Sequence, residues 1–127
     1  MSHGLILPLL LATIVPALAQ KADVVTSEKA KFRVETMASD LENPWAVAFL
    51  PDGRALITER PGRLRILGKD GKLGEVSGVP EVAAVGQGGL LDVILAPDFV
   101  KSRRIYFTYA EPRGAVNGTA VAHARLS

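Results

Sequence analysis

Few side chains in this sequence are placed where they could carry chemistry, and the clearest case is an amide. Gln87 stands in a glycine-rich stretch, residues 86–89, directly before an apolar run that begins at Leu90. An amide both donates and accepts hydrogen bonds, so it suits a ligand hydroxyl group, and Gly88 and Gly89 would let backbone approach closely. The alternative is that Gln87 only satisfies backbone groups within a turn.

The titratable candidates point to structural roles. Asp92 lies inside the apolar run, where an unpaired carboxylate is costly, so we expect it to find a hydrogen-bond partner or to lie at an exposed edge. Glu59 and Arg60 end a predicted strand and are expected to form a charged pair. His123 alternates with apolar residues on another predicted strand, which makes it a poor candidate for a catalytic base.

Composition excludes several classes of function. The chain has no Cys, a formal charge of +2 and no dense basic cluster, so thiolate metal sites, disulfides and nucleic-acid binding are not expected. It also lacks a phosphate-binding glycine loop, a metal-binding His pair and a nucleophile elbow. Trp45 could stack on a ligand ring, but its place in a strand that is apolar on both faces favours core packing.

The first residues have the pattern of an export signal. Residues 1–19 carry no Lys, Arg, Asp or Glu and end in Ala17-Leu18-Ala19 after an apolar run, which predicts a signal peptide cleaved after Ala19. We therefore expect a periplasmic or secreted protein that does not span the membrane after cleavage. Residues 20–31 are polar and are interpreted as a linker, and residues 32–127 as the folded domain.

Alternating apolar residues and turn signals predict short strands throughout that domain. No helical apolar stripe occurs after the signal peptide, so the fold class is all-β. The predicted strands cover residues 32–38, 45–50, 54–59, 63–67, 90–96, 104–110 and 119–126.

A repeat organises these strands. Pro51-Asp52 and Pro97-Asp98 lie 46 residues apart, and each pair stands between two apolar strands. This spacing is typical of the blades of a β-propeller, while a β-sandwich with one chance recurrence is the alternative.

Five motifs in order resemble one enzyme family. They are Leu41–Trp45, Phe49–Gly53, Thr58–Arg60, Gly86–Asp92 and Pro97–Phe99, and the similarity runs from about Phe32 to Ser127. Together they resemble the opening of soluble pyrroloquinoline-quinone-dependent aldose sugar dehydrogenases of the glucose/sorbosone type.

The resemblance implies a six-bladed β-propeller of which this chain forms roughly the first two blades. It implies oxidation of the anomeric hydroxyl of aldose sugars to lactones, with hydride transfer to pyrroloquinoline quinone, calcium as a second cofactor and an external electron acceptor. It places Gln87 in the substrate pocket and assigns no catalytic, cofactor-binding or metal-binding residue to this chain. The catalytic base of such enzymes is a His followed closely by Gly and Arg, and no such segment occurs here.

Two blades would leave apolar faces uncovered, so we expect a truncated domain that is inactive alone and prone to aggregate. A non-catalytic propeller that binds a protein or glycan is the alternative function. A metal-dependent lactonase propeller would need several converging carboxylates, and Asp92 alone is too few.

Overall fold

The computed structural model describes residues 23–127, so the predicted signal peptide and the first residues of the predicted linker lie outside the described residues. The chain divides into two compact units, Met1–Thr36 and Met37–Ser127. Each unit is described by itself.

The described part of the first unit is a β-hairpin. β1 (Asp23–Thr26) pairs antiparallel with β2 (Lys31–Val34), and the Ser27 backbone N–H donates to the Ala30 carbonyl across the turn at 2.9 Å. The segment interpreted as a linker therefore contains a strand. The predicted strand over residues 32–38 ends at Val34, because Ala38 belongs to the second unit and packs on its sheet instead.

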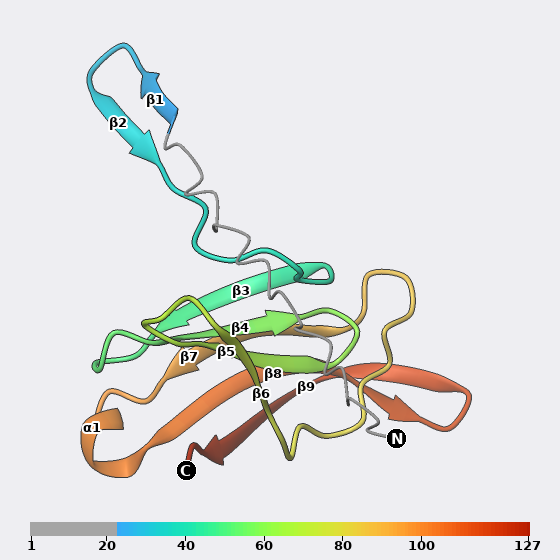
Figure 1. The fold of residues 1–127 in the computed structure, drawn as a ribbon. Helices are drawn as coiled ribbons and strands as arrows, with labels where there is room; N and C mark the ends of the chain where they lie inside the picture. Colours follow the sequence, from blue (N-terminus) through green and yellow to red (C-terminus); the bar gives the residue numbers. More distant parts are fainter. Residues whose placement is uncertain (1–22) are drawn as a thin grey trace, which may run out of the picture. The chain divides into compact units, whose positions relative to one another are not determined.

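The first sheet of the second unit is an antiparallel meander (Figure 1). Its strands are β3 (Pro44–Phe49), β4 (Ala55–Glu59), β5 (Arg63–Leu67) and β6 (Leu73–Val76), in that spatial order. Gly53 takes a φ of 85° in the turn between β3 and β4, and Asp52 Oδ1 accepts the Arg54 backbone N–H there. The sequence predicted β3, β4 and β5 but missed β6.

The second sheet is a three-stranded meander. It consists of β7 (Leu90–Leu95), β8 (Arg104–Arg113) and β9 (Val116–Arg125), in that order. The predicted turn at Pro97-Asp98 leads into a single helical turn, α1 (Phe99–Ser102), which the sequence analysis did not anticipate. All three predicted strands are confirmed, and β8 and β9 are longer than expected.

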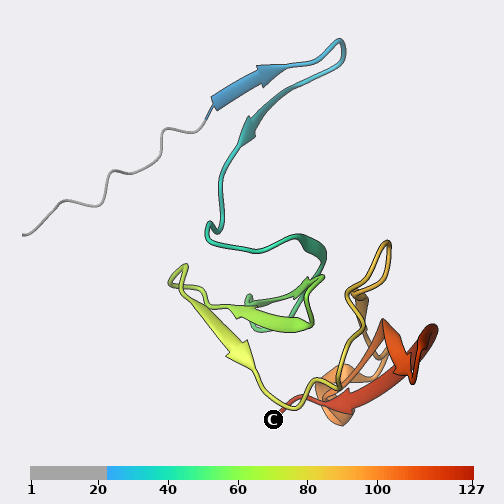
Figure 2. The ribbon, with the colours of Figure 1, turned by 90° about the vertical axis from the view of Figure 1, so that its right-hand side faces the viewer.

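The two sheets lie next to each other (Figure 2), and one apolar core is buried between them. Strands β3 and β4 of the first sheet lie beside β7 of the second. Leu56, Leu90 and Ile105 are the largest apolar side chains that are fully buried, and all three belong to this core. The larger of the two buried apolar clusters therefore lies between the sheets, and a smaller one, built on Ala55, Ile57 and Leu67, lies on the other face of the first sheet.

The repeat predicted from the Pro-Asp turns is also present in the way the strands of the two sheets pair. β3 pairs with β4 from Pro44 to Phe49 with an irregularity between Pro44 and Val47, and β7 pairs with β8 with the same irregularity between Leu90 and Val93. Both positions are displaced by 46 residues between the two sheets. The two meanders thus repeat the same strand arrangement, and each has a β-bulge at the equivalent position of its first strand.

The prediction that Trp45 packs in a core was wrong. Its side chain is 53% exposed, and Phe49 on the same face of β3 is 74% exposed. Ala46 and Ala48 on the other face pack against the second sheet. Within the second unit the Trp45 face of β3 is therefore exposed, because an apolar pattern does not by itself supply a neighbour.

Glu59 is the one fully buried carboxylate in the described part of the chain. Its Oε2 accepts from Arg63 Nε at 2.6 Å and lies 3.4 Å from Arg65 Nη1, while Oε1 accepts the backbone N–H of Glu42. Arg63 also contacts Glu42 through Nη2 at 2.7 Å. Burial acts to raise the pKa of Glu59, but these hydrogen bonds and positive charges outweigh it and hold the pKa below its ordinary value.

Replacing this carboxylate should destabilise the fold and change its response to acid. Glu59→Gln should lower the free energy of unfolding by about 3 kcal/mol, because Arg63 and Arg65 lose the buried carboxylate that balances their charge. The folded-state pKa of Glu59 is depressed, so its stabilisation is present above the unfolded pKa near 4.5 and is lost as pH falls through the lower folded value.

Urea unfolding of both proteins between pH 3 and pH 7 measures both effects. The variant should lose less stability than the wild type below about pH 4.5. Glu81→Gln, at an exposed loop position, is the matched control and should follow the wild type. Equal acid sensitivity of Glu59→Gln and wild type would contradict the assignment.

Candidate functional site

Gln87 lies at the tip of an exposed loop that leads into β7. Its side chain makes no hydrogen bond to any residue in the range 23–127. The interpretation in which Gln87 satisfies backbone groups of its own turn is therefore not supported within the described residues. Its amide remains available to a ligand.

Arg60 holds this loop in place. Its Nη2 donates to the Gly86 carbonyl at 2.8 Å and its Nε donates to the Gly88 carbonyl at 3.2 Å, so one guanidinium binds the residues on both sides of Gln87. The main chain adds a further bond, from the Leu90 N–H to the Arg60 carbonyl at 3.0 Å. The loop is thereby fixed to the end of β4.

The expected Glu59–Arg60 pair does not form. Consecutive residues of a strand point to opposite sides, and here Glu59 turns to Arg63 and Arg65 while Arg60 turns to the glycine loop. Sequence reasoning missed this role for Arg60, because the carbonyls it binds lie 26 and 28 residues further along the chain.

Gly88 and Gly89, which follow Gln87, serve packing within the protein. A Cβ added to Gly89, whose φ is 154°, would lie 2.6 Å from the Arg60 carbonyl oxygen, and one added to Gly88 would lie 2.7 Å from the Ala83 carbonyl oxygen. Both contacts are with backbone, so neither position has room for a side chain. The sequence predicted that these glycines would let a ligand approach the backbone closely. In the structure they instead let the loop backbone pack against Arg60 and Ala83.

Asp92 has the structural role that the sequence predicted. Its Oδ1 accepts the Val93 backbone N–H at 2.9 Å, and the residue lies exposed on the outer face of β7. His123 is exposed on β9 and meets the Tyr106 ring edge-on, with centroids 6.0 Å apart. Neither arrangement is that of a catalytic group.

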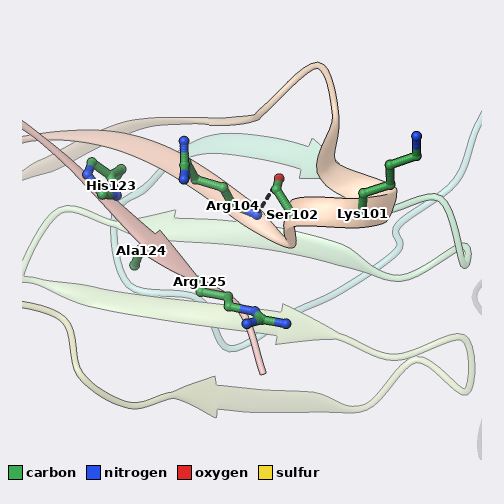
Figure 3. A pocket seen from close by; sticks show the side chains of 6 residues that line it. All are labelled: Lys101, Ser102, Arg104, His123, Ala124 and Arg125. Carbon is green, nitrogen blue, oxygen red and sulfur yellow. Dashed lines mark hydrogen bonds between the residues drawn. The ribbon is translucent and has the colours of Figure 1, made fainter.

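A hollow of about 460 Å³ lies at the other end of the second sheet (Figure 3). β7 begins near Gln87 and ends before α1, and the hollow is beside α1. Its lining is cationic and does not resemble a site for neutral hydroxyl groups, so we do not assign it to the predicted pocket. The lining residues are Lys101, Ser102, Arg104, His123, Ala124 and Arg125.

The described residues do not form a metal site. Across 23–127, no three His, Cys, Asp or Glu side chains gather closely enough to hold a metal ion. In the same range, no helix is long and apolar enough to cross a membrane.

Comparison with known proteins identifies the family. The family model described as Glucose / Sorbosone dehydrogenase matches residues 41–127. Aldose sugar dehydrogenase YliI of Escherichia coli K12 is 53% identical over 102 residues, which are 77% of this chain and 27% of that protein. An uncharacterised Synechocystis protein is 41% identical over 112 residues, covering 80% of this chain and 27% of the relative.

Solved structures share the fold. The apo-form of the soluble aldose sugar dehydrogenase from E. coli matches with a TM-score of 0.69 and 47% identity over 84% of this chain and 29% of that one. The PQQ-bound form of aldose sugar dehydrogenase from Streptomyces coelicolor matches with a TM-score of 0.65 and 27% identity, over 81% of this chain and 28% of that one.

The chain spans less than a third of the length of these relatives. Its two meanders are two blades of the six-bladed β-propeller that the sequence motifs implied. Since the family model covers more than half of the chain, the chain belongs to the glucose/sorbosone dehydrogenase family.

Proposed function

We propose that the full-length protein oxidises the anomeric hydroxyl of aldose sugars to lactones, with hydride transfer to pyrroloquinoline quinone. The family match, the aldose sugar dehydrogenase relatives and the quinone named for the Streptomyces structure support this proposal. Within this chain, the residue proposed to take part is Gln87, whose amide binds a sugar hydroxyl.

The observation that carries the role of Gln87 is a free amide on a fixed loop. Arg60 binds the carbonyls of Gly86 and Gly88, so the amide is held at a defined position while its own donors and acceptor remain unused within residues 23–127. A sugar hydroxyl both donates and accepts, and a single primary amide can satisfy both. A preorganised amide binds such a group at a low entropic cost.

The quinone, when bound, supplies the acceptor for the hydride, and no residue of this chain is assigned to hold it. The proton of the anomeric hydroxyl would go to a His that lies outside these residues. Calcium belongs to the proposal through the resemblance alone, and reduced quinone would pass its electrons to an external acceptor. Export to the periplasm or the medium follows from the predicted signal peptide.

These 127 residues alone should not oxidise sugars. With quinone and calcium added, the chain should give no aldose-dependent dye reduction, while the full-length protein should give it under the same conditions. Dye reduction by the chain alone would contradict the proposed division of roles. A full-length protein that binds a glycan or protein but turns over no aldose would favour the non-catalytic alternative.

Replacing Gln87 should weaken sugar binding without affecting the cofactor. In the full-length protein, Gln87→Ala should raise KM for the best aldose by about tenfold, because one or two neutral hydrogen bonds to the sugar are lost. Steady-state kinetics and quinone titration measure this split. Asn117→Ala, an exposed amide on β9, is the matched control and should leave KM unchanged. An unchanged KM in Gln87→Ala would show that Gln87 does not contact the sugar.

Arg60 should act on the sugar only through the loop. Arg60→Met keeps the aliphatic stem but loses both donors to the glycine carbonyls, so the loop amides should exchange with solvent about tenfold faster. Hydrogen exchange of Gly88 and Leu90 reports this directly, and KM should rise in parallel. Arg54→Met, which removes a guanidinium paired with Asp52 in the turn between β3 and β4, should change neither. Unaltered exchange in Arg60→Met would show that the loop does not depend on this residue.

A further inference from the structure

An arginine stands at the start of the second strand in both sheets. The Leu50 backbone N–H donates to the Arg54 carbonyl at 2.8 Å, and the Ala96 backbone N–H donates to the Arg104 carbonyl at 3.0 Å. Arg54 directly precedes β4, and Arg104 begins β8. The two arginines therefore occupy equivalent positions of the repeat.

The charge of Arg54 is balanced within its own turn. Asp52, two residues earlier, accepts the Arg54 backbone N–H through Oδ1 at 3.1 Å and pairs with Arg54 Nη2 through Oδ2 at 2.8 Å. In the second sheet Ser102 stands two residues before Arg104, and its hydroxyl accepts the Arg104 backbone N–H at 3.2 Å. The hydroxyl keeps the main-chain contact of the carboxylate but carries no charge. The second sheet therefore gives Arg104 no counterpart of the Asp52 charge at this position.

Two further changes add positive charge at the same place. Arg125 of β9 is paired directly opposite Arg104, whereas the equivalent position of the first sheet is Gly68. The connection after the first strand is longer in the second sheet and contains α1, which brings Lys101 to the same hollow. Like charges directly opposite each other on neighbouring strands are unfavourable, so an anion bound between them stabilises the pair.

These cations line the hollow of about 460 Å³ beside α1 (Figure 3). Within residues 23–127, Lys101, Arg104 and Arg125 form no ion pair with a carboxylate. Asp98 accepts the Ser102 hydroxyl through Oδ1 at 2.9 Å and does not pair with these cations. The volume of the hollow is in the range of small-ligand sites.

We propose that this hollow binds a phosphate group, with Lys101, Arg104 and Arg125 donating to its oxygens. A phosphate monoester carries a charge of about −1.5 to −2 near neutral pH and offers three acceptor oxygens, which matches three cationic side chains from three elements. Guanidinium groups form paired, charge-assisted hydrogen bonds with phosphate. The hollow lies at the end of the second sheet opposite Gln87, so this site is separate from the sugar site and does not depend on the proposed oxidation.

The first sheet shows that a packed neighbour leaves this position open. Arg54 lies on the same face of its sheet as Leu56, which is fully buried against the second sheet. The Arg54 side chain nevertheless stays 37% exposed. Because Arg104 occupies the equivalent position, its guanidinium stays accessible in the full-length protein.

Isothermal titration calorimetry of the full-length protein with inorganic phosphate tests the site. Ser102→Asp places a carboxylate where the first sheet has Asp52, so it should balance the charge of Arg104 and weaken phosphate binding about tenfold. Ser102→Asn is the matched control, because its side-chain oxygen can accept the Arg104 backbone N–H without adding charge. Its affinity should stay within about threefold of the wild type.

The arginines are tested in the same way. Arg104→Gln and Arg125→Gln should each weaken phosphate binding about tenfold, because charge-assisted hydrogen bonds to the ligand are lost. Arg54→Gln removes the equivalent arginine of the first sheet, which is paired with Asp52, and should bind phosphate as the wild type does. Acetate at the same ionic strength should not compete, because a carboxylate has one charge and two oxygens.

Vesicles distinguish the two sources of a phosphate group. Flotation with phosphatidic acid vesicles, with phosphatidylcholine vesicles as the reference, identifies a lipid headgroup if the wild type binds and Ser102→Asp does not. Binding of inorganic phosphate without binding to vesicles identifies a soluble phosphate or phosphate ester.

Binding of neither inorganic phosphate nor phosphatidic acid vesicles by the wild type overturns the proposal. It is also wrong if folded Ser102→Asp binds either ligand as tightly as the wild type does, or if acetate binds as tightly as phosphate. Circular dichroism of the two Ser102 variants checks that both are folded.

Discussion

The larger of the two clusters of buried apolar side chains in the second unit lies where its two sheets face each other. Leu56 from one sheet and Leu90 and Ile105 from the other are fully buried in that interface. Burying such side chains stabilises a fold by about 2 kcal/mol each, so this one contact decides whether two short meanders hold together. Trp45 and Val121 are also apolar side chains on these sheets, but they lie on faces without a packed neighbour in the second unit and are exposed.

The candidate site depends on this interface. Gln87 belongs to the connection between the sheets, and Arg60 at the end of β4 binds that connection by side chain and by main chain. Any shift of β7 relative to β4 would move Leu90 away from the Arg60 carbonyl and release the loop. The amide proposed to bind a ligand is thus positioned by apolar packing some residues away, and the glycines make the close fit possible.

Sequence patterns predicted the parts of this fold that local alternation encodes. Strands β3, β4, β5, β7, β8 and β9 were found that way, and the Pro-Asp repeat predicted the equivalence of the two sheets. β6 was missed because Leu73 and Val76 enclose Gly74 and Glu75, which break the alternation. The burial of Trp45 was mispredicted because periodicity reports apolar side chains and says nothing about what covers them. The Arg60 contacts were missed because they join residues far apart in sequence, and no short motif encodes them.

The repeat conserves main-chain geometry between the two sheets while their faces differ. Both bulges are held by a threonine hydroxyl, yet Asp92 replaces Ala46 and His123 replaces Ile66 on the equivalent faces. If every face were the same, any sheet could dock on any other, and copies of the chain could join in open-ended rows. A carboxylate brought against an apolar face without a donor costs free energy, so Asp92 disfavours docking by a sheet that offers it no partner. The shared threonine bond thus holds both bulges in the same geometry, while the side chains beside it give the equivalent faces a different chemistry.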